Sequence, residues 1–234
     1  MTVKEELVQR SPIRIFEQSI NGGLKAGEIG IIASENGVGK TSVLVQLALD
    51  KLLQGKKVIH VSFTQHTHYV PVWYEDIFNE FISKKNLENA AEVKNDLVKN
   101  RVLMNFSQDG VTKAQILRSL RAMIIEGGFK ADSIIIDGFN FACTDKESIA
   151  AVKNFAIELG ISVWYSCSVK GEEQYNKEQI PLVLTDFAGF TDVVIVLLPK
   201  PDHVELSVSK DRDSVISKSM AMKLDPRTLL ILEK

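Results

Sequence analysis

The residues best suited to chemistry lie in a short glycine-bearing segment, residues 34–41, which reads Ser-Glu-Asn-Gly-Val-Gly-Lys-Thr. An apolar run precedes this segment, and apolar residues with helical spacing follow it. Glycines let a backbone wrap with its N–H groups turned inward, and the amino end of a following helix adds positive potential. This order predicts a loop that binds phosphate groups. The residues expected around the phosphates are Ser34, Glu35, Asn36, Gly37, Val38, Gly39, Lys40, Thr41 and Ser42.

Two side chains of this loop have predicted roles. Lys40 would reach the β- and γ-phosphates of a nucleotide and is a candidate catalytic cation, and the Thr41 hydroxyl would bind Mg²⁺. Ser34 stands at the first motif position, where glycine is usual, so the loop could follow a slightly different path. The alternative interpretation is a glycine-rich turn that only caps a helix.

A second candidate is Asp137, which ends the apolar run Ser-Ile-Ile-Ile-Asp at residues 133–137. A carboxylate at the end of a buried strand can hold Mg²⁺ through water, opposite Thr41. Many buried strands end in aspartate at a turn, so this pattern gains its meaning from the glycine loop. The two together predict a nucleotide site with Mg²⁺ bound by Thr41 and Asp137.

Apolar runs rich in Ile and Val supply the strands that would position these residues. They lie at residues 28–33, 58–63, 101–105, 133–137 and 161–168. Segments with helical spacing separate them, at residues 40–53, 72–84, 87–99, 111–127 and 145–159. The alternation predicts an α/β fold with a mostly parallel central sheet and helices on both faces. Later runs joined by short turns, at 193–198, 203–210, 217–224 and 228–232, predict antiparallel hairpins at one edge of the sheet.

The composition limits the class of protein. The chain has 234 residues, a formal net charge of -2, 45% hydrophobic residues and two cysteines. These values favour one globular domain over residues 1–234, without a disulfide framework and without a generally basic surface for nucleic acid. No apolar run approaches the roughly 18 residues of a membrane span, and residues 1–10 lack the apolar core of a secretory signal. A cytoplasmic protein is expected.

These motifs resemble those of the RecA-like P-loop ATPases, and within them the KaiC and DnaB branch. The resemblance extends from about Ile13 to the C-terminus, and it includes Lys40, Thr41 and Asp137. Residues 21–28, Asn-Gly-Gly-Leu-Lys-Ala-Gly-Glu, are similar to the entry into the first strand of KaiC-like domains. The resemblance implies a three-layer P-loop NTPase fold of RecA/KaiC type, with ATP and Mg²⁺ as ligands. It also implies a homo-oligomer, ring or filament, or a protein partner.

Two further segments take part in this resemblance. Thr191-Asp192 precedes an apolar strand, as a similar pair does in relatives, and residues 208–213, Val-Ser-Lys-Asp-Arg-Asp, resemble their Lys-x-Arg motif. In ring-forming relatives these cations reach the γ-phosphate on the neighbouring subunit, so Lys210 and Arg212 are candidate trans fingers. The chemistry suits charge that builds on phosphate oxygens. The alternative is a solvated hairpin turn.

One position departs from the family pattern. Relatives end the second strand with a glutamate that activates the attacking water, whereas this chain has Gln65, or Thr64, at that point. Glutamine can orient water but cannot accept its proton. General-base assistance is worth roughly 10²–10⁴-fold, so slow hydrolysis is expected. His66 is a possible substitute base.

Weaker patterns leave their alternatives open. His66 and His68 have metal-ligand spacing, or are polar residues at the rim of a strand. Trp73, Ile77 and Phe81 form one helical stripe, which indicates core packing or a partner-binding face. Residues 166–168 end a strand where they could contact the γ-phosphate region. Tyr175, in the loop that follows, could stack on a nucleic-acid base.

Three functions are consistent with these residues. The first is a nucleotide-dependent regulatory switch or assembly ATPase with weak hydrolysis. The second is a binding-only protein that uses ATP as a structural ligand, which Gln65 favours. The third is a DnaB-like ATPase that acts on DNA, which the near-neutral charge does not favour.

Overall fold

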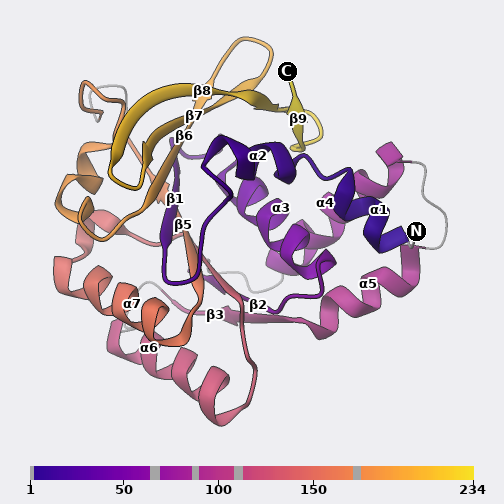
Figure 1. Cartoon of the computed structure of the whole chain (residues 1–234), viewed down its shortest axis with the longest axis horizontal. Helices are drawn as coiled ribbons and strands as arrows, with labels where there is room; N and C mark the ends of the chain where they lie inside the picture. The colour runs from indigo at the N-terminus through magenta and orange to yellow at the C-terminus, as the bar shows by residue number, and fades with distance from the viewer. Residues whose placement is uncertain (1–2, 64–68, 86–89, 108–112, 171–174) are drawn as a thin grey trace.

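A sheet of nine strands runs through the part of the chain that the computed structural model describes, namely residues 3–63, 69–85, 90–107, 113–170 and 175–234 (Figure 1). Its strand order is β3-β2-β4-β5-β1-β6-β7-β8-β9. The pairs among β1 to β6 are parallel, whereas β6 to β9 pair antiparallel. The strands are β1 Ile29–Ser34, β2 Val58–Ser62, β3 Arg101–Asn105, β4 Ser133–Asp137, β5 Ser162–Ser168, β6 Val193–Pro199, β7 Val204–Asp211, β8 Ser214–Leu224 and β9 Ile231–Glu233.

Helices cover both faces of this sheet (Figure 1). Helices α1 to α5 lie over one face, and α6 and α7 lie over the other. The α-helices are α1 Val3–Gln9, α2 Ile13–Ser19, α3 Lys40–Leu53, α4 Tyr69–Lys85, α5 Ala90–Lys99, α6 Lys113–Arg121 and α7 Lys146–Leu159. Short π or 3₁₀ turns are η1 Ala122–Glu126, η2 Phe141–Cys143 and η4 Leu182–Phe187. The predicted α/β architecture, mostly parallel with antiparallel C-terminal strands, is confirmed.

Alternate residues of the central strands enter two separate cores. Ile32 and Trp164 belong to the core that also contains buried residues of α1 to α5, whereas their neighbours Ile31 and Val163 belong to the core with those of α6 and α7. Side chains of a strand point alternately to its two faces, so a strand covered on both sides has apolar residues throughout. All six residues of β1 are buried, which explains the unbroken apolar run in the sequence.

The carboxyl ends of the parallel strands meet at one edge of the sheet. Ser34 at the end of β1 is in register with Ser168 of β5, and Asp137 at the end of β4 is in register with Ser62 of β2. β5 lies between β1 and β4, so the glycine loop and Asp137 are separated by a single strand. Open α/β sheets bind their ligands at this edge.

Three local predictions need correction. Helices α1 and α2 were not predicted, because each has only seven residues and depends on burying Leu7 and Phe16 against the core. The helix predicted at 111–127 leaves α geometry after Arg121, where Gly127 N–H donates to the Ala122 carbonyl. The strand predicted at 228–232 begins three residues later in the structure: residues 225–230 form a turn, and β9 begins at Ile231.

Within the described ranges, none of the helices has both the length and the apolar character needed to cross a bilayer.

Candidate nucleotide-binding site

The glycine loop connects β1 to α3 in a conformation that requires its glycines. Gly37 has φ +80° and Gly39 has φ +118°, both in the region that side chains disfavour. A Cβ on Gly39 would also overlap the Leu224 side chain of β8. Among the described residues, a Cβ on Gly37 would meet nothing within 4 Å.

Lys40 is folded back into the loop. Its side chain is buried, and Nζ donates to the carbonyl oxygens of Ser34 at 3.0 Å and Glu35 at 2.7 Å, with the Ser34 hydroxyl at 3.4 Å. Burial lowers the pKa of Lys40, and the nearby Asp137 carboxylate opposes this shift. Ser34 is fully buried, and its hydroxyl donates to the Glu35 carbonyl at 3.0 Å. Serine at the first motif position is therefore accommodated by the loop.

Thr41 and Asp137 lie together although 96 residues separate them in the chain. The Thr41 hydroxyl donates to Asp137 Oδ2 at 2.8 Å, and Asp137 is buried. Thr41 is in the first turn of α3, and Asp137 ends β4 on the face that α3 covers. Hydroxyl and carboxylate oxygens are hard ligands of the kind that Mg²⁺ accepts beside substrate phosphates. The pair can therefore hold this ion.

The end of β5 borders the same edge. The Ser166 hydroxyl accepts a hydrogen bond from Gly138 N–H at 2.8 Å, just after Asp137. Cys167 is buried, and burial raises its pKa to about 12, so the thiol stays protonated. Tyr175 is partly buried next to the second core, and burial, together with the Glu35 charge, raises its pKa. Serine hydroxyls, and not a thiolate, are the polar groups that β5 offers here.

Arg212 lies away from the glycine loop of its own chain. Its turn follows β7, where Asp211 pairs with Val193 at the amino end of β6. The guanidinium donates to both Glu28 oxygens, at 3.0 and 2.7 Å, to the carbonyls of Ile20 and Gly23, at 2.7 and 2.6 Å, and to Asp211. An arginine has five N–H donors, and each has an acceptor here. The hydrogen bond to Glu28 raises the pKa of Arg212, so it is permanently charged.

Lys210 is also held within its own chain. Its Nζ donates to the carbonyl oxygens of Thr191, at 2.6 Å, and Ala188. The structure therefore brings together Lys40, Thr41 and Asp137, but not Lys210 and Arg212 with them. The trans-finger role of these two cations remains a prediction. Gln65, His66 and His68 lie outside the described residues.

A groove that the sequence did not predict opens between α4 and the turn at residues 225–230. It has a volume of about 330 Å³, and it is lined by Tyr69, Val72, Trp73, Arg227, Thr228 and Leu229 among others. The stripe of Trp73, Ile77 and Phe81 packs mainly into the core, as the core-packing interpretation predicted, while the partly buried Trp73 also borders the groove. The aromatic start of α4 was the only signal in the sequence.

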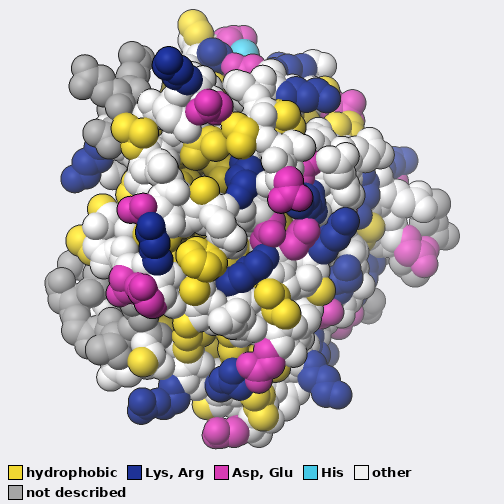
Figure 2. All heavy atoms as spheres, turned by 60° about the vertical axis from the view of Figure 1, so that its left-hand side comes forward, with side chains coloured by type: hydrophobic (Ala, Val, Ile, Leu, Met, Phe, Trp, Pro, Cys, Tyr) yellow, Lys and Arg dark blue, Asp and Glu magenta, His cyan; other side chains and the backbone are white. Residues whose placement is uncertain are grey.

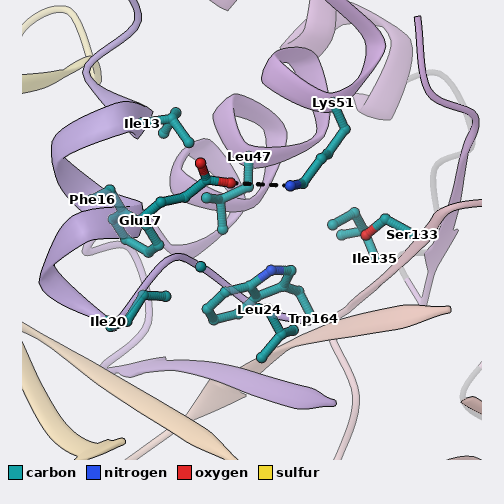
Figure 3. Close-up of a pocket in the computed structure, with 11 residues that line it drawn as sticks. Ile13, Phe16, Glu17, Ile20, Leu24, Leu47, Lys51, Ser133, Ile135 and Trp164 are labelled. Atoms are coloured by element: carbon teal, nitrogen blue, oxygen red, sulfur yellow. Dashed lines mark hydrogen bonds and ion pairs between the residues drawn. The ribbon is translucent and has the colours of Figure 1, made fainter. Parts of the chain in front are cut away.

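A much smaller cavity lies at the far end of α3, under α2 (Figure 3). Its volume is about 10 Å³, and it is bordered by Trp164 and Phe16 and by the Glu17–Lys51 ion pair at 3.0 Å. A space of this size holds one water at most. It is a packing gap and cannot take a nucleotide.

The fold and the site define an α/β protein in which a glycine loop, a buried lysine and a hydroxyl–carboxylate pair meet at one edge of a mostly parallel sheet. A stretch of 47 residues is 41% identical to the DNA repair protein RadA of Aquifex aeolicus (strain VF5). This stretch is 20% of the chain and spans only 10% of RadA's length. No family model matches the chain. The short likeness and the sheet are compatible with a RecA-like fold.

Proposed function

We propose that this chain binds Mg-ATP as a RecA-like protein of the KaiC and DnaB branch, and that it works as a nucleotide-dependent switch with weak hydrolysis. The observation that carries this proposal is the meeting of Lys40, Thr41 and Asp137 at the carboxyl edge of the sheet. Each residue has the chemistry that a triphosphate with its cation requires. Residues 1–234 act as one domain in this proposal.

The phosphates would replace the loop carbonyls as partners of Lys40. The lysine already lies inside the loop, where its ammonium group donates to the carbonyls of Ser34 and Glu35, and in the proposal it would donate to the β- and γ-phosphates instead. Thr41 and Asp137 would then hold Mg²⁺, which neutralises charge on the phosphate oxygens when it is bound. Asp137 also holds Thr41 in place by the 2.8 Å hydrogen bond.

The base would lie in the groove between α4 and residues 225–230. Trp73 offers a flat aromatic face, and Val72 and Leu229 add apolar surface. The wall formed by Leu229 touches Ser42, which directly follows Thr41 in the helix that starts at the phosphate loop. Aromatic stacking on a base contributes about 1–3 kcal/mol.

Titration calorimetry with Mg-ATP tests the proposal. Lys40→Ala should weaken binding at least tenfold, because it removes the charge that meets the phosphates, whereas Lys99→Ala, on the exposed face of α5, should leave binding unchanged. Asp137→Asn should weaken Mg-ATP more than ATP in excess chelator. Folded wild-type protein that gives no heat with ATP or GTP would refute the proposal.

Further measurements distinguish this proposal from two other functions, a binding-only protein and an ATPase that acts on DNA. A steady-state rate of phosphate release no higher than that of Lys40→Ala would favour a binding-only protein, and gain of activity in Gln65→Glu would support the missing-base interpretation. Lys, Arg, Asp and Glu side chains are interspersed on the face shown in Figure 2, which does not favour a nucleic-acid groove there. Salt-dependent binding to single-stranded DNA would instead support a DNA-acting ATPase.

A further inference from the structure

The turn at residues 225–230 is fastened to the helix that begins at the phosphate loop. The Leu229 carbonyl accepts hydrogen bonds from Gln46 Nε2 at 2.9 Å and from the Ser42 hydroxyl. Gln46 Oε1 accepts from the backbone N–H of Ile231 at 2.8 Å. Both the nitrogen and the oxygen of the Gln46 carboxamide are therefore hydrogen-bonded, and the Gln46 side chain is buried. It connects two segments that are more than 180 residues apart.

Leu229 has a backbone conformation that needs such support. Its φ is +56°, in the left-handed region that branched side chains rarely adopt. Asp225 shapes the turn from within, because its side chain accepts from Arg227 N–H at 2.9 Å and from the Thr228 hydroxyl at 3.0 Å. Contacts from two sides thus hold Leu229 in an uncommon conformation, with its side chain at the wall of the groove.

We propose that Gln46 is a positioning residue for the nucleoside part of the ligand, because its hydrogen bonds to the Leu229 carbonyl and Ile231 N–H hold Leu229 in the wall of the groove that Trp73 also lines. The inference rests on the proposed function, and it separates two parts of one site. Lys40 and Thr41 contact the triphosphate from the loop, whereas Gln46 touches no ligand atom and acts through Leu229. Loss of the Gln46 side chain should therefore weaken the binding of a nucleotide, which carries a base, but not the binding of a bare triphosphate.

Calorimetry with two probes, Mg-ATP and Mg-tripolyphosphate, tests this separation. Gln46→Leu keeps the volume but removes all of the amide's hydrogen bonds, and it should weaken Mg-ATP about tenfold while changing Mg-tripolyphosphate less than about twofold. Gln46→Glu, which loses the donor, should behave in the same way. Gln18→Leu, on the exposed face of α2, is the matched control and should change neither.

A hydrogen-exchange measurement and a second variant show whether Gln46 acts through the turn. Hydrogen exchange at the Ile231 amide should quicken in Gln46→Leu, which shows in folded protein that this contact is broken, whereas Gln46→Glu keeps the acceptor of Ile231 N–H and loses only the hydrogen bond to the Leu229 carbonyl. Asp225→Ala loosens the same turn by removing the hydrogen bonds from Arg227 N–H and the Thr228 hydroxyl, and it should repeat the selective loss of ATP affinity. Equal weakening of both probes, or unchanged ATP affinity with fast exchange at Ile231, would overturn the role of Gln46. Wild-type protein that binds neither probe would instead remove the proposed function itself, and this role with it.

Discussion

At the scale of single residues, Gly39 is constrained in two independent ways. Its φ of +118° disfavours any side chain, and Leu224 occupies the place of a Cβ. We expect Gly39→Ala to lower the free energy of unfolding by about 2–5 kcal/mol, from strained backbone plus overlap. Urea unfolding measures it.

Gly55→Ala is the matched control. Gly55 also has positive φ, +79°, but a Cβ there would meet no atom of the described residues within 4 Å. Only the backbone cost applies, so about 1–2 kcal/mol is expected. Equal losses of unfolding free energy in Gly39→Ala and Gly55→Ala would mean that the Leu224 side chain moves aside at no energetic cost.

His60 is a buried residue whose protonation opposes folding. It lies in β2 with no exposure, and Nδ1 is 3.1 Å from the Tyr74 hydroxyl. Burial lowers its pKa to about 4, with the Asp137 charge opposing and the Arg101 charge adding to the shift. The unfolded chain takes up this proton near pH 6.5, so the His60 contribution is intact at pH 7 and is lost as pH falls from 6.5 towards 4.

The expected loss at pH 4 is about 3 kcal/mol, from a shift of that size. Unfolding free energies of wild type and His60→Leu, measured by urea at pH 7 and pH 4.5, should converge as pH falls. Ile59→Val, at the neighbouring buried position of β2, changes no titratable group and is the control that should keep a constant difference from wild type. A constant difference for His60→Leu as well would contradict a neutral buried imidazole.

At the scale of elements, Arg212 ties the turn after β7 to the segment that enters β1. Its partners Glu28, Ile20 and Gly23 all belong to that entry segment. Arg212→Ala would leave the Glu28 carboxylate, which is only 16% exposed, without its cation, and should cost about 2–4 kcal/mol.

Arg121→Ala is the matched control for this prediction. Arg121 also pairs with a glutamate through two nitrogens, but both side chains are about half exposed, so a much smaller loss of stability than in Arg212→Ala is expected. Thermal unfolding of the two variants compares them. Wild-type stability in Arg212→Ala would show that these contacts are dispensable and would leave the guanidinium available to a neighbouring subunit.

Elements whose conformation follows from adjacent residues could be predicted from the sequence, whereas features that depend on distant contacts could not. The loop after β1 and the apolar strand that ends at Asp137 follow from residues adjacent in sequence, and the structure has both elements where they were expected. The Asp-Pro-Arg stretch at residues 225–227 marks a turn locally, but the length of this turn to residue 230 depends on contacts of Leu229 with Ser42 and Gln46, which lie 187 and 183 residues away in the chain. The groove was missed for the same reason, since α4 supplies only one of its walls.

At the scale of the whole molecule, the nine strands form one hydrogen-bonded sheet from β3 to β9. If residues 1–234 are one domain, heat should unfold them in a single transition with equal calorimetric and van't Hoff enthalpies. Two resolved transitions would contradict the single domain.

Assembly is the second expectation at this scale. If a ring or filament assembles on nucleotide binding, light scattering with a non-hydrolysable ATP analogue should report a larger species than without it. A monomer under all conditions would exclude trans fingers at Lys210 and Arg212. A nucleotide-induced oligomer that needs Arg212 would imply that the contacts to Glu28 are exchanged on assembly.

Because Trp73 borders the groove beside α4, its intrinsic fluorescence can report whether the groove is occupied. The chain has two tryptophans, and they lie in opposite surroundings: Trp73 borders the groove, while Trp164 is 3% exposed with its ring centroid 6.0 Å from that of Phe16. A purine stacked in the groove would quench the fluorescence of the first and leave the second unchanged. Emission at long wavelength would thus follow occupancy in real time, while the short-wavelength component serves as an internal standard for the folded state.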